Sequence, residues 1–255
     1  MLSLTDVNFA YEKQKTLDKI NLKIKNGRLT GLIGPNGSGK TTLLKILSGV
    51  LKPAEGRVGL NGGSISELSQ REVARTIAVV PQETNVNFDF TVWEFTLMGR
   101  TPYLRRLENE GNADYNLARE VLKKTGTWDL RNRFITTLSG GERQKVIIAK
   151  ALAQTPKILL LDEPTANLDI KNQIEIMKLL HERVGEQGIT AIMAIHDINL
   201  AARYCDEIVL LKKGRIFDSG SPENVLNEEN IKSVFEVEAR VSENPEGGSV
   251  YIIPK

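Results

Sequence analysis

The chain has 255 residues, 40% of them apolar and 26% charged, so it is long enough to bury a core of ordinary size. Its 34 basic and 32 acidic residues nearly balance, which gives no electrostatic reason to expect a nucleic acid as a partner. The single cysteine, Cys205, excludes an internal disulfide and favours a reducing compartment.

The sequence gives no sign of a membrane-spanning or targeting segment. Residues 1–6 lack the basic and apolar regions of a signal peptide. The longest apolar runs, such as 189–195, are far shorter than the roughly 20 residues that cross a bilayer. If the protein works at a membrane, we expect another chain to supply the spans.

In chain order, strands come first. Alternating apolar and polar residues at 2–9 and 20–25 predict half-buried strands of an antiparallel layer. Residues 29–33 predict a strand that leads through a glycine-rich turn into a helix over 41–48, and 56–60 predicts a short strand before a turn. Three later apolar runs predict buried parallel strands followed by helices, which indicates an α/β core: 77–80, 158–161 and 189–195.

The segment between residues 91 and 155 predicts helices only, near 91–99, 113–124 and 141–154. The tail returns to short strands at 208–211 and 215–218, with a helix at 228–235. We therefore expect a single domain over 1–255. Its predicted parts are an α/β core (about 1–88 and 156–220), a helical subdomain (about 89–155) and a C-terminal extension (about 221–255).

The strongest motif is the phosphate-binding pattern G-x-x-x-x-G-K-[ST], formed by Gly34, Pro35, Asn36, Gly37, Ser38, Gly39, Lys40 and Thr41. Glycines let backbone N–H groups surround phosphate oxygens, and the following helix offers its positive N-terminal end. Lys40 is expected to reach the β- and γ-phosphates of ATP, and the Thr41 hydroxyl to coordinate Mg²⁺. Thr42, next on the helix, is also predicted to contact nucleotide.

Two acidic residues follow the buried run 158–161. Asp162 and Glu163 stand where this strand is expected to end, and ligands of open α/β sheets bind beyond the carboxyl ends of strands. Asp162 is predicted to hold Mg²⁺ directly or through water. Glu163 is predicted to orient or deprotonate the attacking water.

The segment Leu138-Ser139-Gly140-Gly141-Glu142 has two features. Ser139 and Glu142 predict a capping box for the following helix, which leaves the paired glycines unexplained. The segment resembles the LSGGQ or LSGGE signature of the ATP-binding cassette family. The motif order, from phosphate loop through glutamine, signature and acidic strand to histidine, is also that of the family. The resemblance covers Leu2 to about Gly220, and it implies a P-loop NTPase core with a parallel sheet, an N-terminal antiparallel β subdomain and an inserted helical subdomain.

The resemblance also implies roles for further residues. Tyr11 corresponds to the aromatic that stacks on adenine, and Gln82 to the glutamine that contacts Mg²⁺ and water. His196 corresponds to the histidine that contacts the γ-phosphate, whereas His181 is expected to be a surface or packing residue. Asp169 ends the loop that crosses the dimer interface. Ser139, Gly140, Gly141 and Glu142 would complete the nucleotide site of a second copy, so the resemblance implies an ATP-dependent homodimer.

The stretch Thr91-Val92-Trp93-Glu94-Phe95 with Met98-Gly99-Arg100-Thr101-Pro102-Tyr103 is similar to the importer branch for ferric siderophores, haem and cobalamin. The tail, with an acidic helix and strands expected at 234–241 and 250–254, is also similar. This resemblance implies a peripheral ATPase on the cytoplasmic face of the cell membrane. Its expected partners are two transmembrane permease subunits, with an extracellular solute-binding protein acting indirectly.

Other functions stay open at this point. Importers of zinc, manganese or molybdate are close alternatives, and so is a soluble cassette ATPase of iron–sulfur cluster assembly. A DNA-repair member would carry a long coiled coil, and a translation factor would carry two cassettes; the sequence shows neither feature. A catalytically silent ATP-binding module is disfavoured because Lys40, Asp162, Glu163 and His196 are all present.

Overall fold

The computed structural model describes residues 2–12, 14–82, 88–243 and 250–255. Its strands are β1 (Leu2–Tyr11), β2 (Gln14–Lys23), β3 (Leu29–Ile33), β4 (Glu55–Leu60), β5 (Gly63–Ser64), β6 (Ile77–Val80), β7 (Ile158–Asp162), β8 (Thr190–Ala194), β9 (Glu207–Lys212), β10 (Arg215–Gly220), β11 (Ala239–Glu243) and β12 (Val250–Pro254). Its α-helices are α1 (Lys40–Leu47), α2 (Gln70–Ala74), α3 (Val92–Leu97), α4 (Asn112–Lys124), α5 (Gly140–Ala153), α6 (Ile170–Gln187), α7 (Ile198–Tyr204), α8 (Pro222–Val225) and α9 (Glu228–Phe235).

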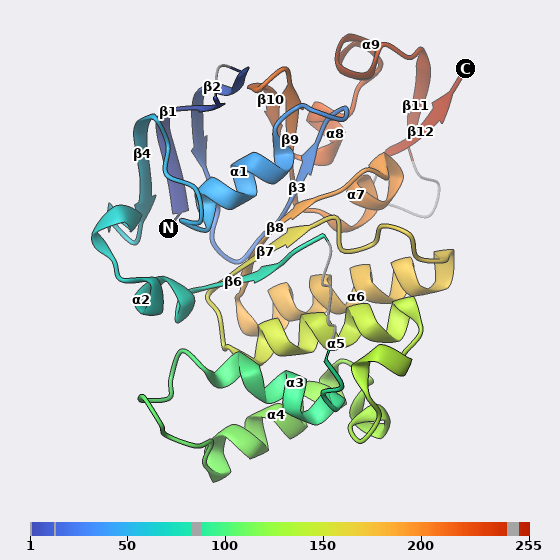
Figure 1. Ribbon diagram of the computed structural model, residues 1–255. Coiled ribbons are helices and arrows are strands. Elements are labelled where there is room, and N and C mark those ends of the chain that lie inside the picture. The colour runs from blue at the N-terminus through green and yellow to red at the C-terminus, as the bar shows by residue number, and fades with distance from the viewer. Residues whose placement is uncertain (1, 13, 83–87, 244–249) are drawn as a thin grey trace.

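A six-stranded sheet runs through the middle of the molecule (Figure 1). Its order is β10-β9-β3-β8-β7-β6, and every neighbouring pair is parallel except β10 with β9. Parallel strands all end at the same edge, so the segments that follow β3, β6, β7 and β8 are brought together there. This arrangement confirms the predicted α/β fold with a parallel sheet.

Both faces of this sheet are buried. Since successive side chains of a strand point to opposite faces, each strand can contribute to an apolar cluster on either side. In β3, Leu29 and Ile33 join the apolar cluster on one face, whereas Leu32 joins the cluster on the other. The first cluster contains side chains of α5, α6 and α7, and the second contains side chains of α1. Each face is thus covered by helices, as parallel sheets require.

A second, antiparallel sheet has the order β2-β1-β4-β5. Its inward residues, such as Leu4 and Val58, share the apolar cluster with Leu43 and Ile46 of α1. Helix α1 therefore lies between the two sheets (Figure 1). The antiparallel layer expected over 2–9 and 20–25 is confirmed: β1 extends two residues further, to Tyr11, whereas β2 begins earlier, at Gln14, and ends at Lys23.

Helices α3, α4 and α5 pack together below the central sheet in Figure 1. The helix expected over 91–99 is shorter: α3 ends at Leu97 and continues as a 3₁₀ turn over Met98–Arg100. At Gly99 the chain approaches α5 so closely that a Cβ atom would lie 2.3 Å from the carbonyl oxygen of Lys150. Because glycine has no Cβ atom, the turn at Gly99 can pack directly against the backbone of α5.

The tail differs from one expectation. The strand predicted over 234–241 is wrong in its first half, because Val234 is a buried residue of α9. That helix ends at Phe235, Glu236 follows it in the left-handed conformation (φ 62°), and the strand begins only at Ala239. Of the helices that the structure describes, none combines the length and apolar character needed to cross a bilayer.

Candidate active site

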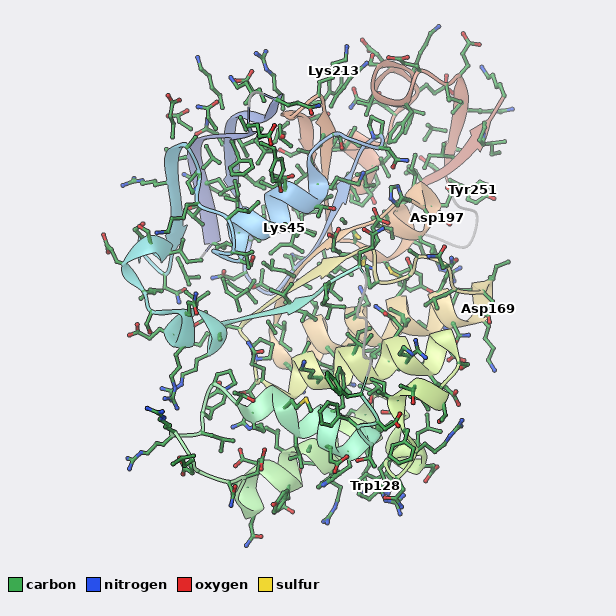
Figure 2. All side chains as sticks on the ribbon, viewed as in Figure 1. Lys45, Trp128, Asp169, Asp197, Lys213 and Tyr251 are labelled. Carbon is green, nitrogen blue, oxygen red and sulfur yellow. The ribbon has the colours of Figure 1, made fainter. Side chains whose placement is uncertain are left out.

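The candidate site lies where four parallel strands end. Strand β3 is followed by the phosphate-loop segment 34–39, β7 ends at Asp162, and Gln82 follows β6. His196 stands two residues beyond the end of β8, directly before Asp197, which caps α7. Figure 2 labels Asp197 and Lys45, which mark this region on α7 and α1.

The phosphate-loop segment has a backbone that needs glycine. Gly37 and Gly39 have φ values of 75° and 104°, in the region that other residues rarely adopt. A Cβ atom at Gly34 would lie 2.2 Å from the carbonyl oxygen of Leu211. These positions hold the loop in one compact shape at the N-terminus of α1, where free N–H groups favour an anion.

Lys40 lies folded against the loop. Its side chain is buried, and Nζ donates to the carbonyl oxygens of Gly34 (2.8 Å) and Pro35 (3.2 Å). Burial lowers the pKa of Lys40, and the negative charges of Glu163 and Asp162 partly offset that effect. The cation is thus desolvated at the mouth of the site, where an anionic ligand would restore favourable interactions.

Asp162 and Thr41 meet although 121 positions separate them: the Thr41 hydroxyl donates to Asp162 Oδ1 over 3.0 Å. Asp162 is only 8% exposed, and burial is the main cause that raises its pKa. The hydrogen bond from Thr41 and the charges of Lys45 and Lys40 act in the opposite direction. A buried carboxylate beside a hydroxyl is an oxygen-rich pair of the kind that binds Mg²⁺.

Glu163 is held from two sides. Gln82 Nε2 donates to Oε2 over 2.8 Å, and His196 Nε2 lies 2.5 Å from Oε1. The Glu163 side chain is 13% exposed, whereas that of His196 is 45% exposed. The Glu163 carboxylate therefore has a fixed orientation, while the His196 ring still faces solvent.

A pocket of about 170 Å³ opens at this point and is lined by Thr16, Glu163 and residues 36–42. Ser38, within this loop, is buried, and its Oγ has no hydrogen-bond partner in the described part of the chain. Within the described residues no group of three or more His, Cys, Asp or Glu side chains could hold a metal alone. Mg²⁺ suits such a site because it keeps waters and substrate phosphates as ligands, so the residues fit both ATP and Mg²⁺.

The signature residues lie elsewhere in the chain, at the start of α5. Ser139 is the N-cap and forms the predicted capping box with Glu142: the Ser139 backbone N–H donates to the Glu142 carboxylate over 2.9 Å. Gly141 packs against α6 so closely that a Cβ atom would lie 2.2 Å from Asn172 Cγ. Gly140 is exposed, and a Cβ atom placed there would lie 3.5 Å from Leu168 Cδ2, which is an ordinary contact distance.

Tyr11 and Asp169 also lie outside the pocket. Tyr11 is 45% exposed at the end of β1 and makes an edge contact with Phe9, with ring centroids 4.9 Å apart. Asp169 caps α6 by accepting from the Asn172 backbone N–H over 2.8 Å. His181 is exposed on α6, and its Nδ1 lies 3.0 Å from the Tyr204 carbonyl oxygen.

The structure thus gathers the loop residues 34–42 with Gln82, Asp162, Glu163 and His196, whereas Tyr11, Asp169 and the signature residues do not line the pocket of a single chain. The sequence motifs did not indicate Thr16, which lines the pocket, or Asn172, which packs against Gly141. Thr16 belongs to no motif, so the sequence did not mark it. In the structure it lies beside the turn at Gly214.

Comparisons with known proteins agree with this geometry. Residues 17–166 match the family described as "ABC transporter". An uncharacterized ABC transporter ATP-binding protein of Methanocaldococcus jannaschii is 42% identical over 252 residues, covering 99% of this chain and 97% of that protein. An iron(3+)-hydroxamate import ATP-binding protein of Bacillus subtilis is 38% identical over 244 residues, covering 96% and 91%.

A cobalamin import ATP-binding protein of Halobacterium salinarum is 38% identical over 253 residues, but the chain spans only 63% of that relative's length. Among solved structures, an inward-facing ABC transporter of the metal-chelate type matches with a TM-score of 0.87 and 28% identity, covering 100% of this chain and 97% of that one. A dimeric bacterial ABC transporter cassette matches with a TM-score of 0.76 and 33% identity, covering 87% and 98%.

Proposed function

The chain belongs to the ABC transporter family of ATPase cassettes, and from that premise we propose that it hydrolyses ATP to drive an importer for a ferric siderophore, haem or cobalamin. The observation that carries the ATPase proposal is the convergence at one sheet edge of a glycine loop, a buried carboxylate and a second carboxylate held by Gln82 and His196. These groups come from four separate strands.

Each group has a role that its surroundings support. The loop N–H groups and Lys40 would bind the phosphates, and Thr41 with Asp162 and Gln82 would hold Mg²⁺, which neutralises phosphate charge when it is bound. Glu163 would accept a hydrogen bond from the attacking water and orient it in line with the γ-phosphate. His196 and Gln82 keep the Glu163 carboxylate in place, so that little reorganisation is needed when ATP is cleaved to ADP and phosphate.

The proposed active form is a homodimer. The signature residues Ser139 and Gly140 are exposed at a helix N-terminus and lie outside the chain's own pocket. The N-terminus of α5 can bind an anion, and a second copy could present it to the phosphates. Asp169 would lie at the same interface, and Tyr11 would stack on adenine. A related cassette is described as dimeric, which supports this proposal.

We propose two permease subunits as further partners, an indirect role for a solute-binding protein and a peripheral position on the cytoplasmic face of the membrane. The names of the iron-hydroxamate and cobalamin import relatives support the solute class. Two exposed aromatic side chains, Phe88 and Phe134, are available for a partner, and a β-bridge joins Phe134 to Thr91 at the start of the helical segment.

Transport in proteoliposomes tests this proposal. The chain would be reconstituted with its permease subunits, and ATP-dependent uptake of ferric hydroxamate, haem and cobalamin would be compared with that of zinc, manganese and molybdate. Uptake of one of the first three, abolished by Lys40→Ala, is the expected result. Uptake of only the second group, or ATP hydrolysis that no permease affects, would contradict the proposed solute class or the importer role.

A further inference from the structure

The C-terminal strand pair, β11 with β12, packs on α7, the helix that begins shortly after His196 (Figure 1). The inward side chains Ala239 and Ile252 are buried in the same apolar cluster as Ala201 and Ala202 of α7. The strand pair lines no part of the nucleotide pocket. Its contact with α7 nevertheless brings the end of the chain to the segment that carries His196.

Asn199 of α7 joins the two elements through a reciprocal pair of hydrogen bonds. Its Nδ2 donates to the Ile252 carbonyl oxygen over 3.1 Å, and the Ile252 N–H donates to Asn199 Oδ1 over 2.8 Å. This exchange of two hydrogen bonds is the one that two residues make across an antiparallel ladder, so the side-chain amide takes the place of a neighbouring strand. Both backbone groups of Ile252 are thus satisfied by one side chain.

A short stretch of fixed backbone connects Asn199 to His196. Asp197 caps α7 by accepting from the Leu200 N–H over 2.9 Å, which fixes the first helical turn. On the other side of His196, the Ile195 N–H donates over 3.2 Å to a carbonyl oxygen of β3. His196 therefore lies between an anchor in the central sheet and an anchor, three residues later, in the C-terminal strand pair.

The His196 ring depends on this backbone for its position. The side chain is 45% exposed, so few neighbours confine it, and its Nε2 lies 2.5 Å from Glu163 Oε1. A displacement of the first turn of α7 would carry the ring away from that carboxylate. Where a site acts by positioning, a displacement of about 1 Å can cost about 10²-fold in rate.

We propose that Asn199 is a positioning residue for ATP hydrolysis: its bonds to Ile252 fix the first turn of α7 and thereby the contact between His196 and Glu163. The inference rests on the roles proposed above for His196 and Glu163. It gives a function to the C-terminal strand pair, which lies beyond the residues 17–166 that match the family.

Asn199→Leu keeps the approximate size of the side chain and removes both hydrogen bonds. For the chain reconstituted with its permease subunits, kcat is expected to fall about tenfold and the KM for ATP to stay within about twofold, because the phosphate loop is untouched. Asn230→Leu is the matched control: Asn230 is also half-buried, and its Nδ2 donates to the Val225 carbonyl oxygen over 2.9 Å. An equal fall of kcat in both variants would reduce the effect to lost packing of the tail and overturn the proposal.

A double-variant cycle separates positioning from a general loss of stability. If Asn199 acts through His196, Asn199→Leu has no further effect on kcat once His196 is replaced by alanine, so the two losses are not additive. A purely structural role would lower the active fraction by the same factor in both backgrounds. Multiplicative losses of kcat in the double variant would therefore contradict the proposal.

Asn199→Asp covers the case in which the leucine variant fails to fold, because a carboxylate in the first turn of α7 suits the positive end of a helix. This variant keeps an acceptor for the Ile252 N–H and loses the donor to the Ile252 carbonyl oxygen. Its kcat is expected to fall about threefold, as for the loss of one hydrogen bond. A kcat equal to that of the wild type would overturn the proposal.

NMR observes the His196 ring independently of turnover. The chain has two histidines, so ¹³C-histidine labelling gives two sets of ring signals, and His181→Gln identifies that of His181. Both Asn199 variants should move the His196 signal in the direction given by Glu163→Ala, because each loosens the same contact. An unmoved signal would refute positioning by Asn199. A moved signal with wild-type kcat in His196→Ala would support that positioning and refute instead the role proposed for His196.

Discussion

Glu163 combines a left-handed backbone conformation with a carboxylate that has a partner at each oxygen. It has a φ of 50°, a left-handed conformation that costs non-glycine residues about 1–3 kcal/mol, and its carboxylate is held by both Gln82 and His196. Its N–H donates to the Ala194 carbonyl oxygen over 3.1 Å, so the turn is fixed to the end of β8. Strain retained where a carboxylate is aimed into a pocket is consistent with a role in chemistry.

Glu163→Gln keeps the size of the side chain and removes its negative charge. ATP turnover by the reconstituted protein is expected to fall about 10²–10⁴-fold, as when a general base is lost, while nucleotide binding persists and the ATP-bound dimer lives longer. Turnover and dimer lifetime would be measured together, with Glu229→Gln, on the surface of α9, as the control. Wild-type turnover in Glu163→Gln would remove Glu163 from its assigned role.

The sequence predicted which residues belong to the site better than it predicted which of them contact one another. Residues 34–41 could be recognised because the glycines, the lysine and the threonine carry their chemistry at fixed spacing. The bond between Thr41 and Asp162 depends on the order of the central strands, which no local pattern contains. The packing of Asn172 against Gly141 likewise became visible only in the structure.

Three helices begin with the same device. Ser69, Thr91 and Ser139 cap α2, α3 and α5, and in each case the glutamate three residues later accepts from the capping residue's backbone N–H. These hydrogen bonds, together with those to the capping hydroxyls, lower the pKa values of Glu72, Glu94 and Glu142. The helix starts thus depend on ionised carboxylates.

Acid should therefore weaken these caps. Because the pKa of Glu94 is lower in the folded protein than its ordinary value of 4.5, its contribution to stability is complete above that value and is lost as pH falls through the folded pKa. Glu94→Gln keeps the hydrogen bonds of the box without the titration. Between pH 6 and pH 3.5 its Tm should fall about 1–3 °C less than that of the wild type.

The matched control is Glu110→Gln, which removes a carboxylate that caps no helix within the described residues. Its Tm should follow the wild-type pH dependence. If Glu94→Gln and the wild type lost the same Tm on acidification, the capping role of the Glu94 charge would be refuted.

Elements with both a clear period and a clear boundary signal were predicted well. Strand β3, with five buried residues before a glycine, and α5, with its capping box, have the expected limits within a residue. The tail was predicted less well, since an apolar residue such as Val234 fits both a strand and an amphipathic helix. Tertiary packing of α9 decided between the two, and Val234 is buried against the core.

Across the whole molecule, the two halves of the proposed site are separated. The pocket is lined by the loop that follows β3 and by Glu163, which follows β7. The signature starts α5, which lies below the central sheet in Figure 1. Both have free N–H groups suited to phosphate, yet one chain does not bring them together. A head-to-tail pair of copies would form two composite sites.

A mixing experiment tests this arrangement. Lys40→Ala and Ser139→Arg should each abolish ATP turnover, the second without weakening nucleotide binding by the monomer. Random pairing of the two variants gives heterodimers in half of the population, each with one intact composite site, so about a quarter of wild-type turnover is expected. No rise above the separate variants would exclude sites shared between copies.

The most direct measurement is a crystal structure of the chain with Mn²⁺ and a non-hydrolysable ATP analogue. Polyphosphate density is expected within residues 34–41 and against Lys40, with an anomalous Mn²⁺ peak beside Thr41 Oγ1 and Asp162. An obstructed loop, or an analogue and a metal bound elsewhere while Lys40 still donates to Gly34 and Pro35, would contradict it.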